Sequence, residues 1–220
     1  MKFKSLVKDL IQNKDLFAKM EQYVDMIEEK NKVMNLTGFS GDRLWQEGIY
    51  ESLIALETKI PNQDIKLLDI GAGAGFPSIP FVIANPKVHL TIFEPKQKRV
   101  KFLQEVINQL KLNVSIKILR VEESKTKNHF DFITARAVAP LKALIEASHH
   151  VGKNDAHYVW LKGPSYQEEI DNASKIIKKL KLEINVIPLN YESKNIVIIH
   201  YTKSSPTPDG IPRKWAQIVK

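Results

Sequence analysis

The segment from residue 65 to residue 78, IKLLDIGAGAGFPS, constrains the fold of this chain more than any other part. It begins with a short apolar run of the length expected for a buried strand in a parallel sheet. Gly71, Gly73 and Gly75 follow at alternate positions, and Pro77 suits the first turn of a helix, where a missing N–H is tolerated. A strand, a glycine turn and a helix in this order predict an α/β sheet that brings its backbone close to a nucleotide-like ligand.

The spacing of the glycines selects among such ligands. A dinucleotide fingerprint would need its third glycine at the position of Phe76, and no Walker-type Gly-Lys-Ser/Thr follows. With Asp69 at the end of the strand, the motif Asp-x-Gly-x-Gly-x-Gly resembles the first motif of the S-adenosylmethionine-dependent methyltransferases. Glycines let the backbone approach the amino-acid end and ribose of that ligand, and the Asp69 carboxylate can answer an ammonium or sulfonium group. A tight turn without a ligand is the alternative, although three alternating glycines exceed what one turn needs.

Composition narrows the class of partner. The chain has 220 residues, 43% of them hydrophobic, and a formal charge of +8, which favours a polyanionic partner, nucleic acid above all. Cysteine is absent and the six histidines show no metal-ligand spacing, so we expect no metal site and a cytoplasmic location. Charges interrupt the N-terminus too often for a secretory signal, and no apolar run is long enough to span a membrane.

The hydrophobic pattern predicts three parts. Residues 1–62 form a helical extension packed on the core, which is the best candidate for an added substrate-binding element; residues 63–203 form an α/β domain; residues 204–220 form a basic tail that is Pro-rich and irregular as far as 214. The strands are expected at 65–70, 88–93, 114–119, 130–135, 156–161, 182–189 and 195–201, the last two joined as an antiparallel hairpin through the short loop at 190–194. The helices are expected within 1–60 (one of them over 41–58), over 96–111, after Pro140 and from Ser165, where Ser165-x-x-Glu168 predicts a capping box.

Polar side chains follow several of these strands, at the edge of the sheet where ligands bind. Glu94 ends the second strand and is expected to accept hydrogen bonds from ribose hydroxyls, the alternative being a surface ion pair with Lys96 or Lys98. Arg136 stands between two alanines after the fourth strand and is predicted to contact cofactor, phosphate or base, with a surface salt bridge as the alternative. Lys162 follows the fifth strand.

Two further groups of residues have two possible interpretations, a functional one and that of an exposed, solvated surface. The tetrapeptide from Arg120 to Glu123 follows the third strand and has the backbone and carboxylate to contact an adenine ring, or it is an exposed loop. Four cations crowd the start of the helix over 96–111, where they oppose the helix dipole, so a phosphate backbone is one expected partner. They are Lys96, Lys98, Arg99 and Lys101.

Taken in order, these blocks resemble the bacterial 16S ribosomal RNA guanine-N7 methyltransferases, the glucose-inhibited division protein B family. The resemblance covers nearly the whole chain and rests on LLDIGAGAGFPSIP, KRVKFL, RVEE, ARA, LKG and the upstream NLT. It implies a Rossmann-like fold with a seven-stranded, mostly parallel sheet and an antiparallel edge strand. It also implies that S-adenosylmethionine is the cofactor and that the substrate is one guanine of 16S ribosomal RNA in the assembled small subunit. The cofactor contacts that it implies are Gly71, Phe76, Val121, Glu122 and Arg136.

The chain departs from the pattern of that family at three places. Ser78 stands where the family usually has a glycine, Gly48 replaces a histidine, and the tail keeps Pro212-Arg213-Lys214 but lacks the Gly-Thr-Pro-rich end. The last two departures fall where RNA binding is expected, so the choice of substrate depends on them more than the choice of cofactor does.

The expected site therefore has a cofactor half and an RNA half. Guanine N7 carries a lone pair and loses no proton, so no catalytic base is needed, and Arg136 and Lys162 are expected to position substrate; Arg136→Ala should weaken methyl transfer and leave the fold intact.

We expect a monomer that binds the small ribosomal subunit and no membrane. The alternatives are a methyltransferase acting on another nucleic acid, a protein or a small molecule, and an RNA-binding ribosome-assembly factor with a vestigial cofactor site. The predicted cofactor-binding residues are Asp69, Gly71, Gly73, Gly75, Phe76, Glu94, Val121, Glu122 and Arg136. The predicted RNA-binding residues are Lys96, Lys98, Arg99, Lys101, Arg120, Lys162, Arg213 and Lys214.

Overall fold

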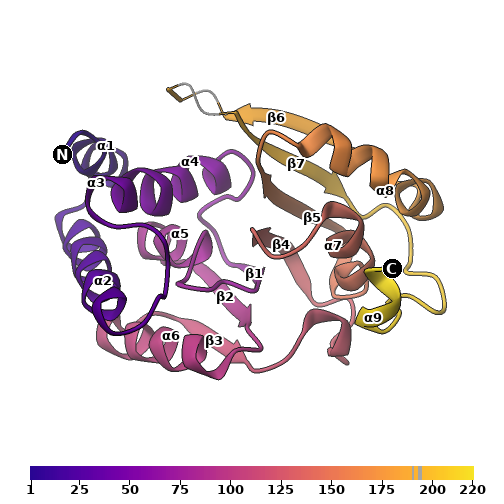
Figure 1. Ribbon diagram of the computed structural model, residues 1–220, viewed down its shortest axis with the longest axis horizontal. Coiled ribbons are helices and arrows are strands. Elements are labelled where there is room, and N and C mark those ends of the chain that lie inside the picture. Colours follow the sequence, from indigo (N-terminus) through magenta and orange to yellow (C-terminus); the bar gives the residue numbers. More distant parts are fainter. Residues whose placement is uncertain (190, 193–194) are drawn as a thin grey trace.

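Seven strands form one twisted sheet at the centre of the computed structural model, which describes residues 1–189, 191–192 and 195–220 (Figure 1). The strand order is β3-β2-β1-β4-β5-β7-β6. Neighbouring strands from β3 to β5 pair in parallel, whereas β7 is antiparallel to both β5 and β6. The predicted mostly parallel sheet and terminal hairpin are confirmed, with the reversed strand β7 one position in from the edge. The strands are β1 (Ile65–Ile70), β2 (Val88–Phe93), β3 (Val114–Lys117), β4 (Phe130–Arg136), β5 (Gly152–Lys162), β6 (Asn185–Leu189) and β7 (Ile196–Thr202).

Three strand boundaries differ from the expected ones by two residues or more, for reasons of pairing. β5 begins at Gly152, because Gly152 pairs with Phe130 and a register shift before Phe132 accommodates the extra residues. β3 ends at Lys117 and β6 begins only at Asn185, where their neighbours stop pairing. Of the predicted hairpin loop, residues 190 and 193–194 lie outside the described residues.

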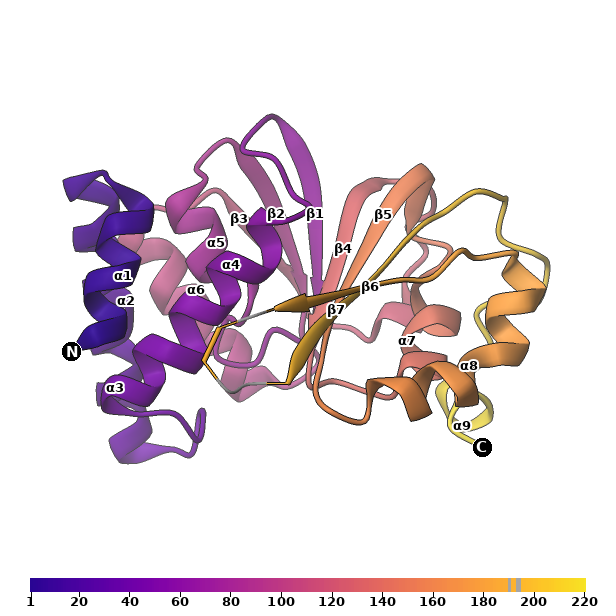
Figure 2. The ribbon, with the colours of Figure 1, turned by 90° about the horizontal axis from the view of Figure 1, so that it is seen from above.

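Helices cover both faces of the sheet, and Figure 2 shows the sheet between the two layers. One layer contains α1 to α6 and shares a hydrophobic core with one face of the sheet, which includes Leu67, Phe132 and Ile198. The other contains α7 to α9 and shares a second core with the opposite face, which includes Leu68, Ile133 and Ile199. In the part of the chain described, none of the helices has the length and apolar character needed to cross a membrane. The helices are α1 (Lys2–Ile11), α2 (Lys14–Val33), α3 (Gly41–Arg43), the π-helix η1 (Leu44–Tyr50), α4 (Glu51–Glu57), α5 (Ser78–Ala84), α6 (Gln97–Leu110), the 3-10 helix η2 (Val121–Glu123), α7 (Leu141–Ser148), α8 (Tyr166–Leu180) and α9 (Trp215–Ile218).

The first 60 residues fold as helices that pack on α5 and α6. The apolar stripe predicted for α2 is confirmed, since Met20, Tyr23 and Ile27 are fully buried. The helix predicted over 41–58 consists of α3, η1 and α4 in succession, with a π-helical turn in the middle. Gly48 lies in that turn, where a Cβ atom would come within 2.8 Å of both Leu44 Cδ1 and Phe76 Cζ. The histidine that the resemblance implies at this position would require the Leu44 and Phe76 side chains to move.

The predicted capping box at the start of α8 is wrong. Ser165 precedes the helix with φ −81° and ψ 15°, and its side chain makes no capping hydrogen bond. The extended backbone that directs an N-cap hydroxyl toward the first turn is absent here.

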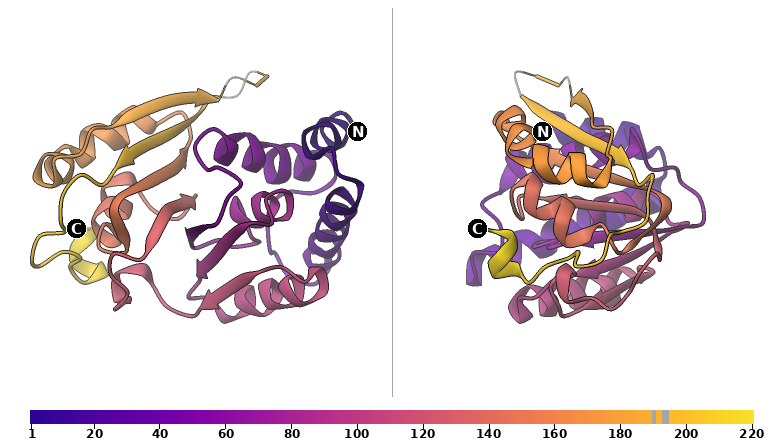
Figure 3. Two further views of the ribbon diagram at one scale, coloured as in Figure 1. Left: turned by 180° about the vertical axis from the view of Figure 1, so that it is seen from behind. Right: turned by 90° about the vertical axis from the view of Figure 1, so that its right-hand side faces the viewer.

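The C-terminal tail runs alongside α7 and α8, as the right-hand view of Figure 3 shows. Residues 204–214 contain no helix or strand, as predicted, and the short helix α9 follows. Ile218 is fully buried in the second core, so the end of the tail is anchored.

Candidate active site

The glycine loop follows β1 in a conformation that other residues rarely adopt. Gly71, Gly73 and Gly75 have φ angles of 68°, 62° and 112°. A Cβ atom on Gly71 would lie 2.9 Å from Val138 Cγ2, and one on Gly75 would lie 2.6 Å from Tyr23 Oη, so both positions need glycine. At Gly73 the nearest atom would be Arg99 Nη1 at 3.8 Å, which leaves this side of the loop open to a ligand.

Asp69 lies beneath this loop and is fully buried. Its Oδ2 accepts a hydrogen bond of 2.5 Å from Ser78 Oγ, and its Oδ1 has no hydrogen-bond partner among the described residues. Burial raises the pKa of Asp69 to about 7. Ser78, which stands where the resemblance implies a glycine, therefore binds the buried carboxyl group of Asp69.

Glu94 joins the loop to the start of α6. Its carboxylate accepts hydrogen bonds from the N–H groups of Gly73 at 3.1 Å and Lys96 at 2.9 Å, and Arg99 Nη1 lies 3.8 Å away. The alternative ion pair with a lysine side chain is not formed. The structure thus brings Glu94 to the open side of the glycine loop, as the prediction requires, although only 1% of the residue is exposed.

Val121 and Glu122 form η2 beside the ends of β1 and β2. Val121 is buried in the same core as Ile70 and Phe93. Burial raises the pKa of Glu122, whose Oε1 is buried without a hydrogen-bond partner in the described chain. An unsatisfied carboxyl oxygen at this edge is an acceptor that a bound ligand can use.

Arg136 is held by the N-terminal helices. Its Nη2 lies 3.0 Å from Glu51 Oε1, and its Nη1 donates to the carbonyl oxygen of Glu47 at 2.6 Å. Glu51 is 3% exposed and also accepts a hydrogen bond of 2.6 Å from Tyr191 Oη. The alternative of a salt bridge is realised, but the pair is buried rather than on the surface.

A pocket of about 470 Å³ opens next to the glycine loop, between Arg136 and Lys162. Lys162 Nζ donates to Glu169 Oε2 at 2.6 Å and to the carbonyl oxygen of Ala139 at 2.9 Å. The wall of the pocket therefore has two cations and two carboxylates, each paired. Val138 also lines the pocket and would touch a side chain at Gly71, so the pocket adjoins the loop. The lining residues are Glu51, Arg136, Ala137, Val138, Ala139, Pro140, Leu161, Lys162, Gly163, Glu169 and Ile196.

The predicted RNA-binding residues other than Lys162, which lines the pocket, lie in two places. Lys96, Lys98 and Lys101 are exposed at the start of α6, beside Glu94, and Arg120 is exposed next to η2. Arg213 and Lys214 lie in the tail near α7, where Arg213 donates to both oxygens of Glu146 at 2.5 and 2.8 Å. Arg120 bridges the two places, because its guanidinium lies 5.3 Å from the ring centroid of Trp215 in α9.

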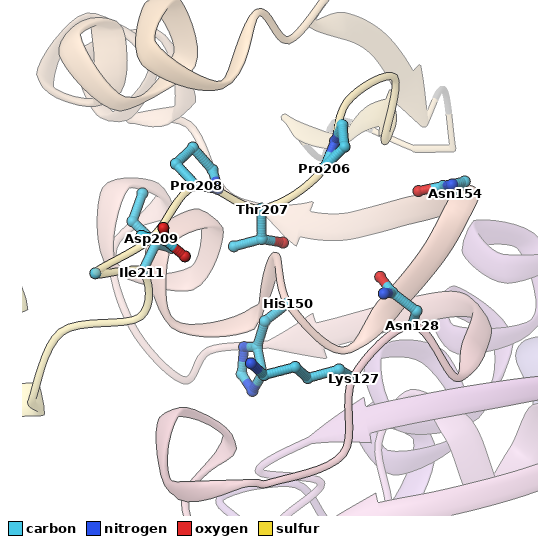
Figure 4. Close-up of a pocket in the computed structure, with 10 residues that line it drawn as sticks. Lys127, Asn128, His150, Asn154, Pro206, Thr207, Pro208, Asp209 and Ile211 are labelled. Atoms are coloured by element: carbon cyan, nitrogen blue, oxygen red, sulfur yellow. The ribbon is translucent and has the colours of Figure 1, made fainter.

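A separate pocket of about 300 Å³ lies where the tail passes the start of β4 and contains none of the predicted site residues (Figure 4). His150 and Thr207 line it. His149 Nδ1 lies 2.8 Å from Thr207 Oγ1, and burial lowers the pKa of His149 to about 4. His149 therefore stays neutral near pH 7 and fastens the tail to the domain, whereas His150 Nε2 lies 3.1 Å from the carbonyl oxygen of Ser124.

Two contacts beside the candidate site were absent from the sequence-based prediction. Glu51 is the partner of Arg136, and its position seven residues after Leu44 and four before Ala55 was the signal that it lies on the buried face of the helix. Tyr23 donates to the carbonyl oxygen of Ala74 at 2.7 Å and so supports the glycine loop from α2. No sequence pattern marks that contact, because it depends on how α2 packs.

Comparison with known proteins agrees with this arrangement. The family model described as rRNA small subunit methyltransferase G matches residues 16–197. A ribosomal RNA small subunit methyltransferase G from Mycoplasmopsis pulmonis is 47% identical over 209 residues, covering 92% of this chain and 91% of that protein. Its counterpart from Malacoplasma penetrans is 34% identical, covering 100% and 98%.

Solved structures confirm the fold. A SAM-dependent methyltransferase from Aquifex aeolicus superposes with a TM-score of 0.57 at 21% identity, covering 74% of this chain and 94% of that one. TYW2 from P. horikoshii in complex with MeSAdo superposes with a TM-score of 0.60 at 20% identity, covering 79% and 67%.

Proposed function

The chain belongs to the rRNA small subunit methyltransferase G family, and on that premise we propose that it methylates N7 of a guanine in 16S ribosomal RNA, using S-adenosylmethionine. The observation that carries the proposal is that an open glycine loop, with Glu94 bound to it, adjoins a pocket large enough for a base. We further propose that the substrate is the small ribosomal subunit and that the enzyme acts as a monomer in the cytoplasm.

The residues at the loop fit the proposed cofactor. Gly73 presents bare backbone, since a Cβ atom there would meet no other atom closer than 3.8 Å, and Glu94 and Glu122 offer carboxylate acceptors on the same edge. Gly71, Gly73, Glu94, Val121 and Glu122 would hold the cofactor; Asp69 and Phe76, both buried, would act by fixing the loop. When bound, S-adenosylmethionine supplies an electrophilic methyl group on a sulfonium, which leaves as a neutral thioether.

The pocket suits a reaction that moves positive charge onto the base. Guanine N7 attacks with its own lone pair, so no proton is transferred and the product base becomes cationic. In the pocket wall Arg136 is paired with Glu51 and Lys162 with Glu169, so the local charge is balanced and does not oppose that cation. Catalysis then depends on alignment of the base and on exclusion of water.

The test is methyl transfer from labelled S-adenosylmethionine to small subunits that lack the modification, with naked 16S RNA and DNA in parallel. We expect the label in 7-methylguanosine after nuclease digestion and mass spectrometry. Label in another nucleoside, in DNA or in protein would contradict the substrate assignment while keeping the fold.

A glycine variant ties the reaction to the loop. Gly71→Ala places a Cβ atom 2.9 Å from Val138 at a positive φ and should abolish cofactor binding measured by calorimetry. Gly38→Ala is the matched control, because a Cβ there meets nothing within 4 Å. Equal cofactor affinity in the two variants would contradict the role of the loop.

A further inference from the structure

A second pocket lies outside the methyl-transfer site, between α7, the C-terminal half of α8 and the tail turn at residues 210–213. We call it the basic groove. Its volume is about 350 Å³, and its lining includes Lys142, Lys175, Lys179 and Arg213, with Ile176 and Ile211 as apolar parts. Figure 1 shows α7, α8 and α9 together at the end of the molecule opposite α1.

The carboxylate that lines the basic groove is already neutralised. Glu146 is 3% exposed and accepts two hydrogen bonds from Arg213, which hold its pKa below the ordinary value. Lys142, Lys175 and Lys179 have no ion-pair partner in the described part of the chain. The groove therefore presents three uncompensated positive charges.

Helix stability does not explain these lysines as a set. A cation in the last turn of α8, such as Lys179, favours the helix dipole, but Lys142 is in the first turn of α7, where a cation opposes it. Lys175 and Lys179 are four residues apart on one helix face, a like-charge pair that destabilises an isolated helix. An external anion would relieve both.

The basic groove is connected to the candidate active site through the tail. Arg213 at the groove is followed by Trp215, whose ring carries the guanidinium of Arg120, and Arg120 directly precedes the cofactor-side residues Val121 and Glu122. A path with the exposed cations Arg120 and Lys214 thus runs from the cofactor edge over α9 to the groove. A chain of phosphates that extends beyond the target nucleotide would follow this path.

We propose that the basic groove binds the phosphodiester backbone of ribosomal RNA at a point outside the methyl-transfer pocket, an inference that rests on the proposed function. Backbone contacts of this kind fix the register of a protein on RNA and carry no sequence information. Their contribution falls steeply with salt, because each neutralised phosphate releases counterions.

The experiment compares two double variants of the full-length protein. Lys175→Ala/Lys179→Ala removes charge from the groove, whereas Lys14→Ala/Lys87→Ala removes the same charge from exposed lysines elsewhere that have no ion pair in the described chain. Affinity for protein-free 16S RNA and for small subunits is measured at several salt concentrations, together with calorimetric affinity for S-adenosylmethionine.

For the groove variant we expect about tenfold weaker RNA binding near physiological salt and a log–log salt slope smaller by about two. The KM for RNA should rise with little change in kcat, cofactor affinity should stay at the wild-type value, and the control should match the wild type. An unchanged affinity and slope would overturn the proposal. Loss of binding to subunits but not to protein-free RNA would also overturn it, in favour of a contact with a ribosomal protein.

The failure of the proposed function gives a different result. If RNA binding depends on Lys175 and Lys179 but no methyl group is transferred to ribosomal RNA, the RNA-binding role of the groove is supported and the proposed reaction is contradicted. If methylation proceeds and the groove variant binds RNA as the wild type does, the RNA-binding role of the groove is contradicted and the proposed reaction is supported.

Discussion

The N-terminal helices and the rest of the molecule use their charges differently. Residues 1–62 contain nine Lys and Arg and ten Asp and Glu, whereas residues 63–220 contain 24 and 15. In the first region five of the nine cations form ion pairs, namely Lys2, Lys4, Lys30, Lys32 and Arg43. The other four, Lys8, Lys14, Lys19 and Lys59, form none among the described residues. In the second, the lysines at the start of α6 and in the basic groove have no such partner among the described residues.

The two regions therefore differ in role: the paired charges of residues 1–62 stabilise the fold, whereas the unpaired charges of residues 63–220 attract RNA. Ion pairs within the first region and across to Glu105 and Glu192 orient the helices on the domain. The whole net positive charge comes from the second region, so the long-range attraction for a polyanion originates there. The N-terminal extension, which the sequence suggested as a substrate-binding element, contributes to the pocket through Glu51 rather than through positive charge.

The largest expected effect comes from breaking the bridge between the two regions. Arg136→Ala leaves the buried Glu51 carboxylate without its cation and should lower the free energy of unfolding by about 3–5 kcal/mol, besides weakening methyl transfer. The sequence alone predicted that this substitution leaves the fold intact; with the buried pair in view, we instead expect a loss of stability. Urea denaturation measures the change.

A double variant separates the two roles of Arg136. Arg136→Ala/Glu51→Ala removes both charges and should recover part of the lost stability, while methyl transfer stays low. An unfolding midpoint for Arg136→Ala equal to that of the wild type would mean that the two regions are not joined through this pair.

A smaller effect is expected from placing at Gly48 the histidine that the resemblance implies. Gly48→His places atoms where Leu44 and Phe76 already lie and should destabilise the protein by about 1–3 kcal/mol. Gly38→His is the control, because its surroundings are open. The midpoint of thermal unfolding should be lower for Gly48→His than for Gly38→His. Equal midpoints would mean that η1 rearranges at little cost to accept the larger side chain.

The smallest effect is expected at the exposed ion pairs of the first region. Lys32→Ala removes a pair whose side chains are 67% and 71% exposed and should change stability by no more than about 0.5 kcal/mol. Its affinity for 16S RNA should equal that of the wild type in the same salt titration used for the groove. A loss as large as that of the groove variant would remove the distinction between the two regions.

The sequence predicted the parts of the site that depend on neighbours along the chain. Gly71, Gly73 and Gly75 can be recognised because positive φ angles and close backbone approach require glycine wherever the rest of the chain lies. The strands flanking them follow from short apolar runs, and Glu94 follows from the end of one.

The parts that depend on packing could not be predicted in the same way. Arg136 was predicted to contact cofactor, phosphate or base, with a surface salt bridge as the alternative. The structure pairs it with Glu51, which is 85 positions away and is supplied by the helical extension. Asp69 was predicted to bind the cofactor; its carboxyl group is buried and accepts a hydrogen bond from Ser78, a contact that the sequence analysis did not predict. A side chain's direction relative to a loop depends on tertiary contacts that no local pattern encodes.

The position of the reversed strand β7 within the sheet affects the tendency of copies of this protein to aggregate through their sheet edges. Because β7 lies inside the sheet, the two outer strands are β3, which has four residues, and β6, which contains Pro188. A short border and a border with a proline give a foreign strand few backbone groups with which to pair. The sheet is thereby protected from edge-to-edge aggregation, while both of its broad faces are covered by helices.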